Sequence, residues 1–191
     1  ASNNAHKIKE IRAILGDFFD IVSLREAGVE SDPEETGKTF EENARIKAVA
    51  GMKASGMPCI ADDSGLEVLA LDCRPGVMSA RYSGSHGDDA ANNEKLLAEL
   101  ADKPDRSARY VCVICMAFPD GRELEARGEC YGEILKEKRG NGGFGYDPLF
   151  YFPQFGKTFA EISSEEKNEV SHRNAALKAF EKLWEKEIND K

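Results

Sequence analysis

The feature that most constrains the fold is a pair of long strand-like segments separated by a tight turn. Residues 108–118 form an apolar run, and residues 123–134 follow after the turn Pro119-Asp120-Gly121. Two such runs joined by a few residues that include glycine are typical of a β-hairpin. Any fold for this chain must therefore contain a sheet.

The rest of the chain alternates between helix-like and strand-like segments. Apolar residues at helical spacing predict helices over residues 7–15, 39–55, 88–100 and from Ser171 onward. Thr39 and Glu42 predict a cap at the start of the second of these helices. Short apolar runs predict strands over residues 18–24, 58–61, 66–70 and 149–152. Helices interleaved with strands indicate an α/β protein with a mixed β-sheet. No linker or repeat interrupts residues 1–191, so we expect a single domain with room for two lobes.

Composition excludes several classes of protein. Lys and Arg number 26 against 35 Asp and Glu, and a net charge of −9 argues against general binding to nucleic acid or to anionic membranes. No apolar run approaches the roughly 18 residues of a membrane span. Cys112 and Cys115 lie in one predicted strand, where positions three apart face opposite sides. We expect the five cysteines to be reduced core residues of a cytoplasmic protein rather than zinc ligands.

Two adjacent carboxylates are the strongest candidate for a reactive site. Asp62 and Asp63 follow a short buried run and precede Ser64-Gly65, which predicts a strand that ends in a turn. Oxygen ligands suit Mg²⁺, which takes one or two protein carboxylates together with substrate phosphates. Glu34 and Glu35 lie upstream and can complete such a site, although the pair can equally belong to a solvated acidic loop.

Several basic residues lie at or near predicted helices, in positions that suit binding of an anion. Lys47 follows Asn43 by one helical turn, on the flank of the apolar face, where it either meets an anion or extends to solvent. Small polar residues precede the first helix, whose N-terminal amides can hold a phosphate. Lys167, His172 and Arg173 surround the start of the last helix. Each of these residues also has a purely structural interpretation as a cap or a surface residue.

A glycine-rich stretch covers residues 140–148 and reads Gly-Asn-Gly-Gly-Phe-Gly-Tyr-Asp-Pro. Its glycines permit positive φ and close backbone approach, so its amides can hold an anion or a base edge. Phe144 and Tyr146 offer a stacking surface for a nucleobase, and Asp147 can accept from base N–H groups. Carboxylates for a metal, cations for phosphates and an aromatic loop for a base together predict hydrolysis of a nucleoside triphosphate.

Six ordered motifs resemble the inosine triphosphate pyrophosphatase family over nearly the whole chain. They are Ser2-x-Asn4-x-x-Lys7, Glu35-Thr-Gly-x-Thr-Phe-x-Glu-Asn-Ala44, Ala61-Asp-Asp-Ser-Gly-Leu66, Pro75-Gly-Val-x-Ser-Ala-Arg-Tyr82, Gly142-Gly-Phe-Gly-Tyr-Asp-Pro148, and Lys167 with Ser171-His-Arg173. The resemblance implies an elongated mixed sheet flanked by helices, with a central substrate cleft between two lobes, and a homodimer. It also implies Mg²⁺-dependent cleavage of dITP, ITP and XTP to the nucleoside monophosphate and pyrophosphate.

The resemblance further implies roles for single residues. Asp63 would be the catalytic acid/base residue and a metal ligand, and of the two upstream glutamates we favour Glu34 as the second ligand. The expected substrate-binding residues are Ser2, Asn3, Asn4, Ala5, His6, Lys7, Lys47, Ser64, Phe144, Gly145, Tyr146, Asp147, Lys167, His172 and Arg173.

Two alternatives stay open. The chain can be a nucleotide-sensing module that binds without hydrolysis, or a related pyrophosphatase that prefers modified pyrimidine triphosphates. Product analysis after incubation with ITP and Mg²⁺ separates the sensor from an enzyme. A panel of substrates separates the purine enzyme from the pyrimidine enzyme.

Overall fold

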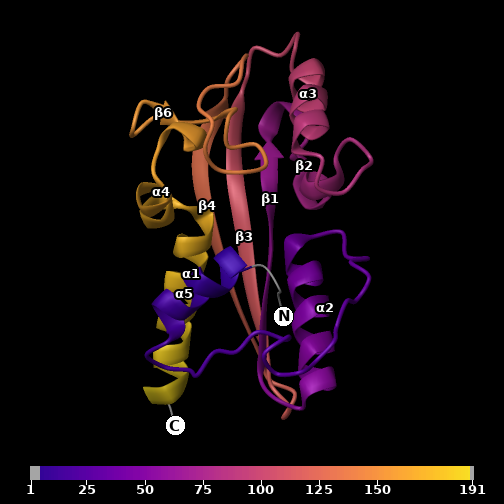
Figure 1. Cartoon of the computed structure of the whole chain (residues 1–191), viewed down its shortest axis with the longest axis vertical. Coiled ribbons are helices and arrows are strands. Elements are labelled where there is room, and N and C mark those ends of the chain that lie inside the picture. Colours follow the sequence, from indigo (N-terminus) through magenta and orange to yellow (C-terminus); the bar gives the residue numbers. More distant parts are fainter. Residues whose placement is uncertain (1–4, 190–191) are drawn as a thin grey trace. The chain divides into compact units, whose positions relative to one another are not determined.

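A single sheet of six strands is present in the part of the chain that the structure describes, with the order β2-β1-β3-β4-β5-β6 (Figure 1). This structure is a computed structural model, and it describes residues 5–189, apart from the side chains of residues 5, 6 and 10. The strands are β1 (Cys59–Val68), β2 (Arg74–Pro75), β3 (Ser107–Ala117), β4 (Glu123–Ile134), β5 (Phe150–Phe152) and β6 (Lys157–Thr158). The predicted hairpin is confirmed as β3 and β4.

We expected a mixed sheet, but the strand pairs described here are antiparallel. β2 pairs antiparallel with β1, β5 with β4 and β6 with β5. Arg109 of β3 contacts Glu67 of β1, whereas Cys112, further along β3, contacts Asp62, which comes earlier in β1. β1 and β3 therefore also run in opposite directions. In every neighbouring pair except β1 and β3, the two strands follow one another in the chain, and short returning connections of this kind favour antiparallel pairs.

Helices account for most of the remaining chain and confirm the predicted α/β class. They are α1 (Ala5–Leu15), α2 (Phe40–Ser55), α3 (Asp89–Glu99), α4 (Ser164–Val170) and α5 (His172–Asn189). Short 3₁₀ turns lie at Leu69–Leu71, Gly76–Arg81 and Phe159–Glu161. The predicted cap of α2 is present, because the Thr39 side chain accepts the Glu42 N–H. None of the helices in the described part of the chain is both long and apolar enough to span a membrane.

The chain divides into two compact units, each with its own apolar core. Unit 1 comprises Ala1–Ser64, Cys112–Gly128 and His172–Lys191, and unit 2 comprises Gly65–Val111 and Glu129–Ser171. The core of unit 1 packs α1 and α5 against β3, through residues such as Leu15, Ile114 and Phe180. The core of unit 2 contains Leu96 and Phe150. These units correspond to the two expected lobes, and a substrate cleft between the lobes stays a prediction.

Residues 18–24 form a loop with turns, so the strand predicted there is wrong. The Arg12 Nε donates to the Ile21 carbonyl oxygen at 2.8 Å, which occupies an acceptor that a strand would use for its neighbour. Phe19 and Ile21 pack against the core of unit 1 from this loop. The apolar residues of this segment therefore reflect packing against the core and not pairing with another strand.

The strands predicted at residues 58–61 and 66–70 are one continuous strand, β1. Asp62 and Asp63 consequently lie inside a strand and not in the turn that we predicted after it. Both aspartates are buried, with 4% and 8% of their surface exposed. A strand can carry two buried carboxylates only if each is paired, and the pairs are described below.

The structure describes all five cysteines, and each is a free thiol. Cys59, Cys112, Cys115 and Cys130 are buried. Burial raises the pKa of Cys115 and of Cys130 to about 12, so both thiols are protonated at neutral pH. These four cysteines act as small apolar packing residues, as the sequence predicted, whereas Cys73 is only partly buried and is not a core residue.

Candidate active site

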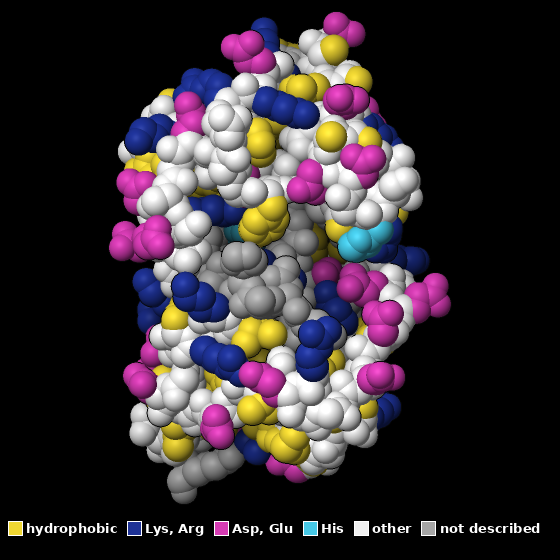
Figure 2. All heavy atoms as spheres, viewed as in Figure 1, with side chains coloured by type: hydrophobic (Ala, Val, Ile, Leu, Met, Phe, Trp, Pro, Cys, Tyr) yellow, Lys and Arg dark blue, Asp and Glu magenta, His cyan; other side chains and the backbone are white. Residues whose placement is uncertain are grey.

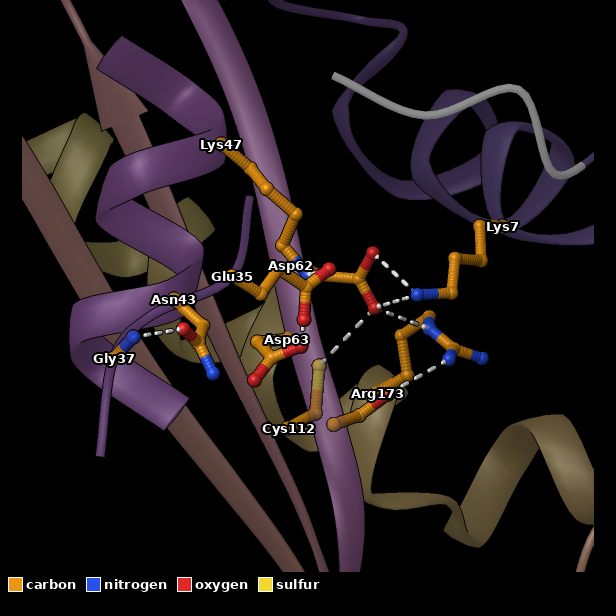
Figure 3. Close-up of polar contacts among 10 residues, drawn as sticks. Lys7, Glu35, Gly37, Asn43, Lys47, Asp62, Asp63, Cys112 and Arg173 are labelled. Atoms are coloured by element: carbon orange, nitrogen blue, oxygen red, sulfur yellow. Dashed lines mark hydrogen bonds and ion pairs between the residues drawn. The ribbon is translucent and has the colours of Figure 1, made fainter. Parts of the chain in front are cut away.

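Asp62 holds two cations of unit 1 (Figure 3). Both carboxylate oxygens lie 2.9 Å from the Lys7 Nζ of α1, and one lies 3.4 Å from the Arg173 Nε of α5. Burial raises the pKa of Asp62, but the charges of Lys7 and Arg173 outweigh it and leave this pKa well below the ordinary value. Asp62 is therefore ionised at neutral pH, and it fixes the positions of both cations.

Asp63 faces a different neighbour because adjacent residues of a strand point to opposite sides. Its Oδ1 accepts from the Lys47 Nζ of α2 at 2.7 Å, and the Glu35 Oε1 lies 3.2 Å from the same Nζ (Figure 3). Burial raises the pKa of Asp63, Lys47 lowers it by less, and Glu35 raises it further. The net pKa is above the ordinary value, so two neighbouring aspartates are shifted in opposite directions. Such divergence is typical of acid/base sites.

The sequence left open whether Lys47 contacts an anion or extends to solvent, and the structure shows that it contacts the carboxylates of Asp63 and Glu35. Only 15% of its side chain is exposed. Burial lowers the pKa of Lys47, but Asp63 and Glu35 raise it by more, so the ammonium group stays charged. Glu34, by contrast, is exposed, and its carbonyl oxygen accepts the Thr36 N–H. Of the two candidate glutamates, the structure brings Glu35 and not Glu34 to Asp63.

Ser64 and the start of α5 complete this group in unit 1. The Arg173 Nη2 lies 3.5 Å from the Ser64 Oγ. His172 and Arg173 are buried, at 7% and 6% exposure. Ser2, Asn3 and Asn4 lie outside the described residues. Ala5 and His6 begin α1, and their side chains also lie outside the description.

Unit 2 gathers the candidates from the glycine-rich stretch. Asp147 is 1% exposed, and its carboxylate accepts from the Tyr110 hydroxyl at 3.2 Å, the Phe144 N–H at 3.0 Å, and the Lys167 ammonium. The carboxylate that we expected to accept from base N–H groups is thus turned inward. It anchors the loop and Lys167, a role that no local sequence signal indicates because Tyr110 and Lys167 are distant in the chain.

The two aromatic candidates of this loop differ in exposure. Phe144 is 61% exposed, and the Lys167 Nζ lies 4.4 Å from its ring centroid. Tyr146 is 3% exposed and donates its hydroxyl to the Ser79 carbonyl oxygen at 2.9 Å. Tyr146 is therefore a core residue, and of these two rings Phe144 is the one that can stack on a base. Gly145 lies between them with a φ of 62°, a conformation that favours glycine.

The sequence comparison decides the family. The Ham1 family model matches residues 1–183. This chain belongs to the Ham1 family. The family assignment agrees with the resemblance carried by the six motifs.

Relatives of this Ham1-family chain align over most of their length. The protein named dITP/XTP pyrophosphatase from Desulfotalea psychrophila is 57% identical over 178 residues, which cover 93% of this chain and 80% of that protein. The protein of the same name from Clostridium perfringens is 53% identical over 186 residues, covering 93% and 91%. A solved Ham1 protein from Staphylococcus aureus has a TM-score of 0.89 at 46% identity, covering 97% and 96%. A solved HAM1 protein from Coxiella burnetii has a TM-score of 0.90 at 43% identity, with the same coverage.

The oxygen atoms of this Ham1-family site fit Mg²⁺. Asp63 and Glu35 both contact one ammonium nitrogen, so two carboxylates already converge on a single cation. Within the described residues, no group of three or more His, Cys, Asp and Glu side chains could hold a metal by itself. Mg²⁺ needs no such group, because it usually takes one or two carboxylates and completes its shell with substrate phosphates and water.

Proposed function

We propose that this chain is a Mg²⁺-dependent pyrophosphatase for non-standard purine nucleoside triphosphates, with dITP, ITP and XTP as its substrates. The products would be the nucleoside monophosphate and pyrophosphate. The name shared by relatives of 47–57% identity supports the reaction and the substrate class. The observation that carries the proposal is the difference between the ion pairs of two adjacent aspartates. Asp62 contacts two cationic side chains, whereas Asp63 and Glu35 contact the same Lys47 ammonium group.

Asp63 would activate or orient the water that attacks the α-phosphorus. A general base works best when its pKa lies near the operating pH, and the raised pKa of Asp63 moves it in that direction. Lys7, Lys47 and Arg173 would offset the charge of the triphosphate, which is the main requirement of phosphoryl chemistry. When bound by Asp63 and Glu35, Mg²⁺ would add further neutralisation of phosphate charge.

Phe144 would stack on the purine, since its ring is exposed next to the Lys167 ammonium. Base choice would rest on hydrogen bonds to a 6-oxo group. Adenine presents a donor at that position, which would leave donors of the site unpaired, and such a mismatch discriminates strongly.

We also propose a cytoplasmic homodimer that binds neither nucleic acid nor membranes. The net charge of −9 supports the proposal that the chain binds neither nucleic acid nor anionic membranes. Figure 2 shows Lys and Arg side chains interspersed with Asp and Glu side chains over the visible face of the described residues. Sedimentation equilibrium tests the dimer directly.

Product analysis tests the proposed reaction. With ITP and Mg²⁺ we expect inosine monophosphate and pyrophosphate in equal amounts, and turnover of ITP, dITP and XTP at least about 100-fold faster than that of ATP. Anion-exchange chromatography of the nucleotides with a pyrophosphate assay measures both. Inosine diphosphate with orthophosphate would contradict the cleavage position. Binding without turnover would favour the nucleotide sensor, and preference for modified pyrimidine triphosphates would favour the related pyrophosphatase.

A further inference from the structure

The loop that carries Glu35 is fastened to α2 by one buried side chain. Asn43 is fully buried, and its Oδ1 accepts the Gly37 N–H at 2.8 Å (Figure 3). Glu35 precedes Gly37 by two residues and contacts Lys47, which follows Asn43 by one turn of the same helix. The loop is thus held to α2 at two points, through its backbone at Gly37 and through the carboxylate of Glu35.

Gly37 suits this contact because it has no side chain. A Cβ at this position would lie 2.5 Å from the Asn43 Oδ1 and 2.9 Å from the Asn43 backbone nitrogen. The backbone nitrogen belongs to the first turn of α2, so it cannot withdraw without disturbing the helix. The close approach of the loop therefore requires glycine, and it sets the distance between the loop and the face of α2 that carries Lys47.

The amide nitrogen of Asn43 is a second, independent observation. Asn43 Nδ2 is buried and has no acceptor among the residues that the structure describes. In Figure 3 it lies on the side of Asn43 that faces Asp63, while the carbonyl end faces Gly37. Buried donors of this kind are rare in folded proteins and call for an explanation beyond packing.

We propose that Asn43 is a positioning residue of this site. Its carbonyl oxygen fixes the loop at Gly37, so that Glu35 and Asp63 converge on one cation, and its amide is directed toward Asp63. The part of this inference that concerns the cation rests on the proposed function, whereas the fastening of the loop does not. Sequence spacing alone indicated that Asn43 and Lys47 share a helix face, and the structure shows that both face the same loop.

Amide exchange tests the fastening. In Asn43→Ala, the Gly37 N–H loses its acceptor, and we expect its hydrogen exchange, followed by NMR, to be at least tenfold faster. Gly37→Ala should accelerate exchange in residues 35–38 similarly, because its Cβ displaces Asn43. Asn43→Asp keeps an acceptor oxygen and should stay within threefold of the wild type. Ser55→Ala is the matched control, because it removes a side-chain contact at the other end of α2. Unchanged Gly37 exchange in Asn43→Ala would overturn the proposal.

Binding of Mn²⁺ alone, measured by water-proton relaxation without nucleotide, tests the consequence for the cation. We expect Asn43→Ala and Glu35→Gln each to weaken Mn²⁺ binding at least fivefold, and Glu34→Gln to stay within twofold of the wild type. Faster Gly37 exchange with unchanged Mn²⁺ affinity in Asn43→Ala would overturn the positioning role, as would a wild-type protein that binds no Mn²⁺. Neither measurement involves ITP, so failure of the proposed reaction would be seen separately in the product analysis.

Discussion

We expect Asp63→Asn to lower the rate of pyrophosphate release from ITP by about 10²–10⁴-fold, the usual contribution of a general base. The substitution keeps the shape of the side chain but replaces the carboxylate, which would accept a proton, by a neutral amide. Lys47 retains Glu35 as a partner at 3.2 Å, so the change leaves no buried cation unpaired. We therefore expect the free energy of unfolding to change little. Initial rates from a coupled pyrophosphate assay and urea unfolding curves measure the two quantities.

The matched control for this variant is Asp102→Asn, which alters an exposed aspartate of unit 2. It should leave both the rate and the stability near the wild-type values. Asp63→Asn within threefold of the wild-type rate would remove Asp63 from the mechanism. A large loss of stability in Asp63→Asn would show instead that the aspartate is mainly structural.

Asp62→Asn has the largest expected effect on stability. Its carboxylate balances Lys7 and Arg173 in a buried setting, and only 2% of its side chain is exposed. Removing one partner of a buried ion pair costs about 3–5 kcal/mol. Urea unfolding at pH 7 should therefore show a much larger loss for Asp62→Asn than for Asp63→Asn. Equal losses in the two variants would contradict the separate roles of these aspartates.

The stability that Asp62 contributes should depend on pH in a defined direction. The pKa of Asp62 is lower in the folded protein than in the unfolded chain, where it is about 3.9. The contribution is therefore fully present above that value and is lost as the pH falls toward the lower folded-state pKa. The stability difference between wild type and Asp62→Asn should be constant from pH 6 to 7 and should shrink below about pH 4.

Local patterns predicted the elements whose signals are contained in short segments. The hairpin over β3 and β4 follows from two apolar runs and one turn, and the start of α2 follows from Thr39 and Glu42. The resemblance to a known family predicted the residues that gather around Asp62 and Asp63, because its motifs are ordered and specific. Lys47 could be placed beside the apolar face of α2 from its spacing to Asn43 and to the apolar residues of that helix.

The remaining features depend on contacts between distant residues. The sequence predicted a turn at Asp62 and Asp63 because Asp, Ser and Gly favour turns. In the strand, Asp62 pairs with Lys7 and Arg173, and Asp63 pairs with Lys47. The inward direction of Asp147 depends on Tyr110, which is 37 residues away in the chain. Glu34 and Glu35 are adjacent and chemically alike, so only the structure shows that Glu35 is the one that contacts Lys47 of α2.

Asp62 and Asp63 are adjacent in one strand, yet their surroundings shift their pKa values in opposite directions. Carboxyl ¹³C NMR of the metal-free protein, titrated with acid and assigned with Asp62→Asn and Asp63→Asn, measures both values directly. We predict that Asp63 titrates above the ordinary aspartate value of about 3.9 and that Asp62 remains ionised well below it. Titration of both carboxylates at the same ordinary value would contradict the account.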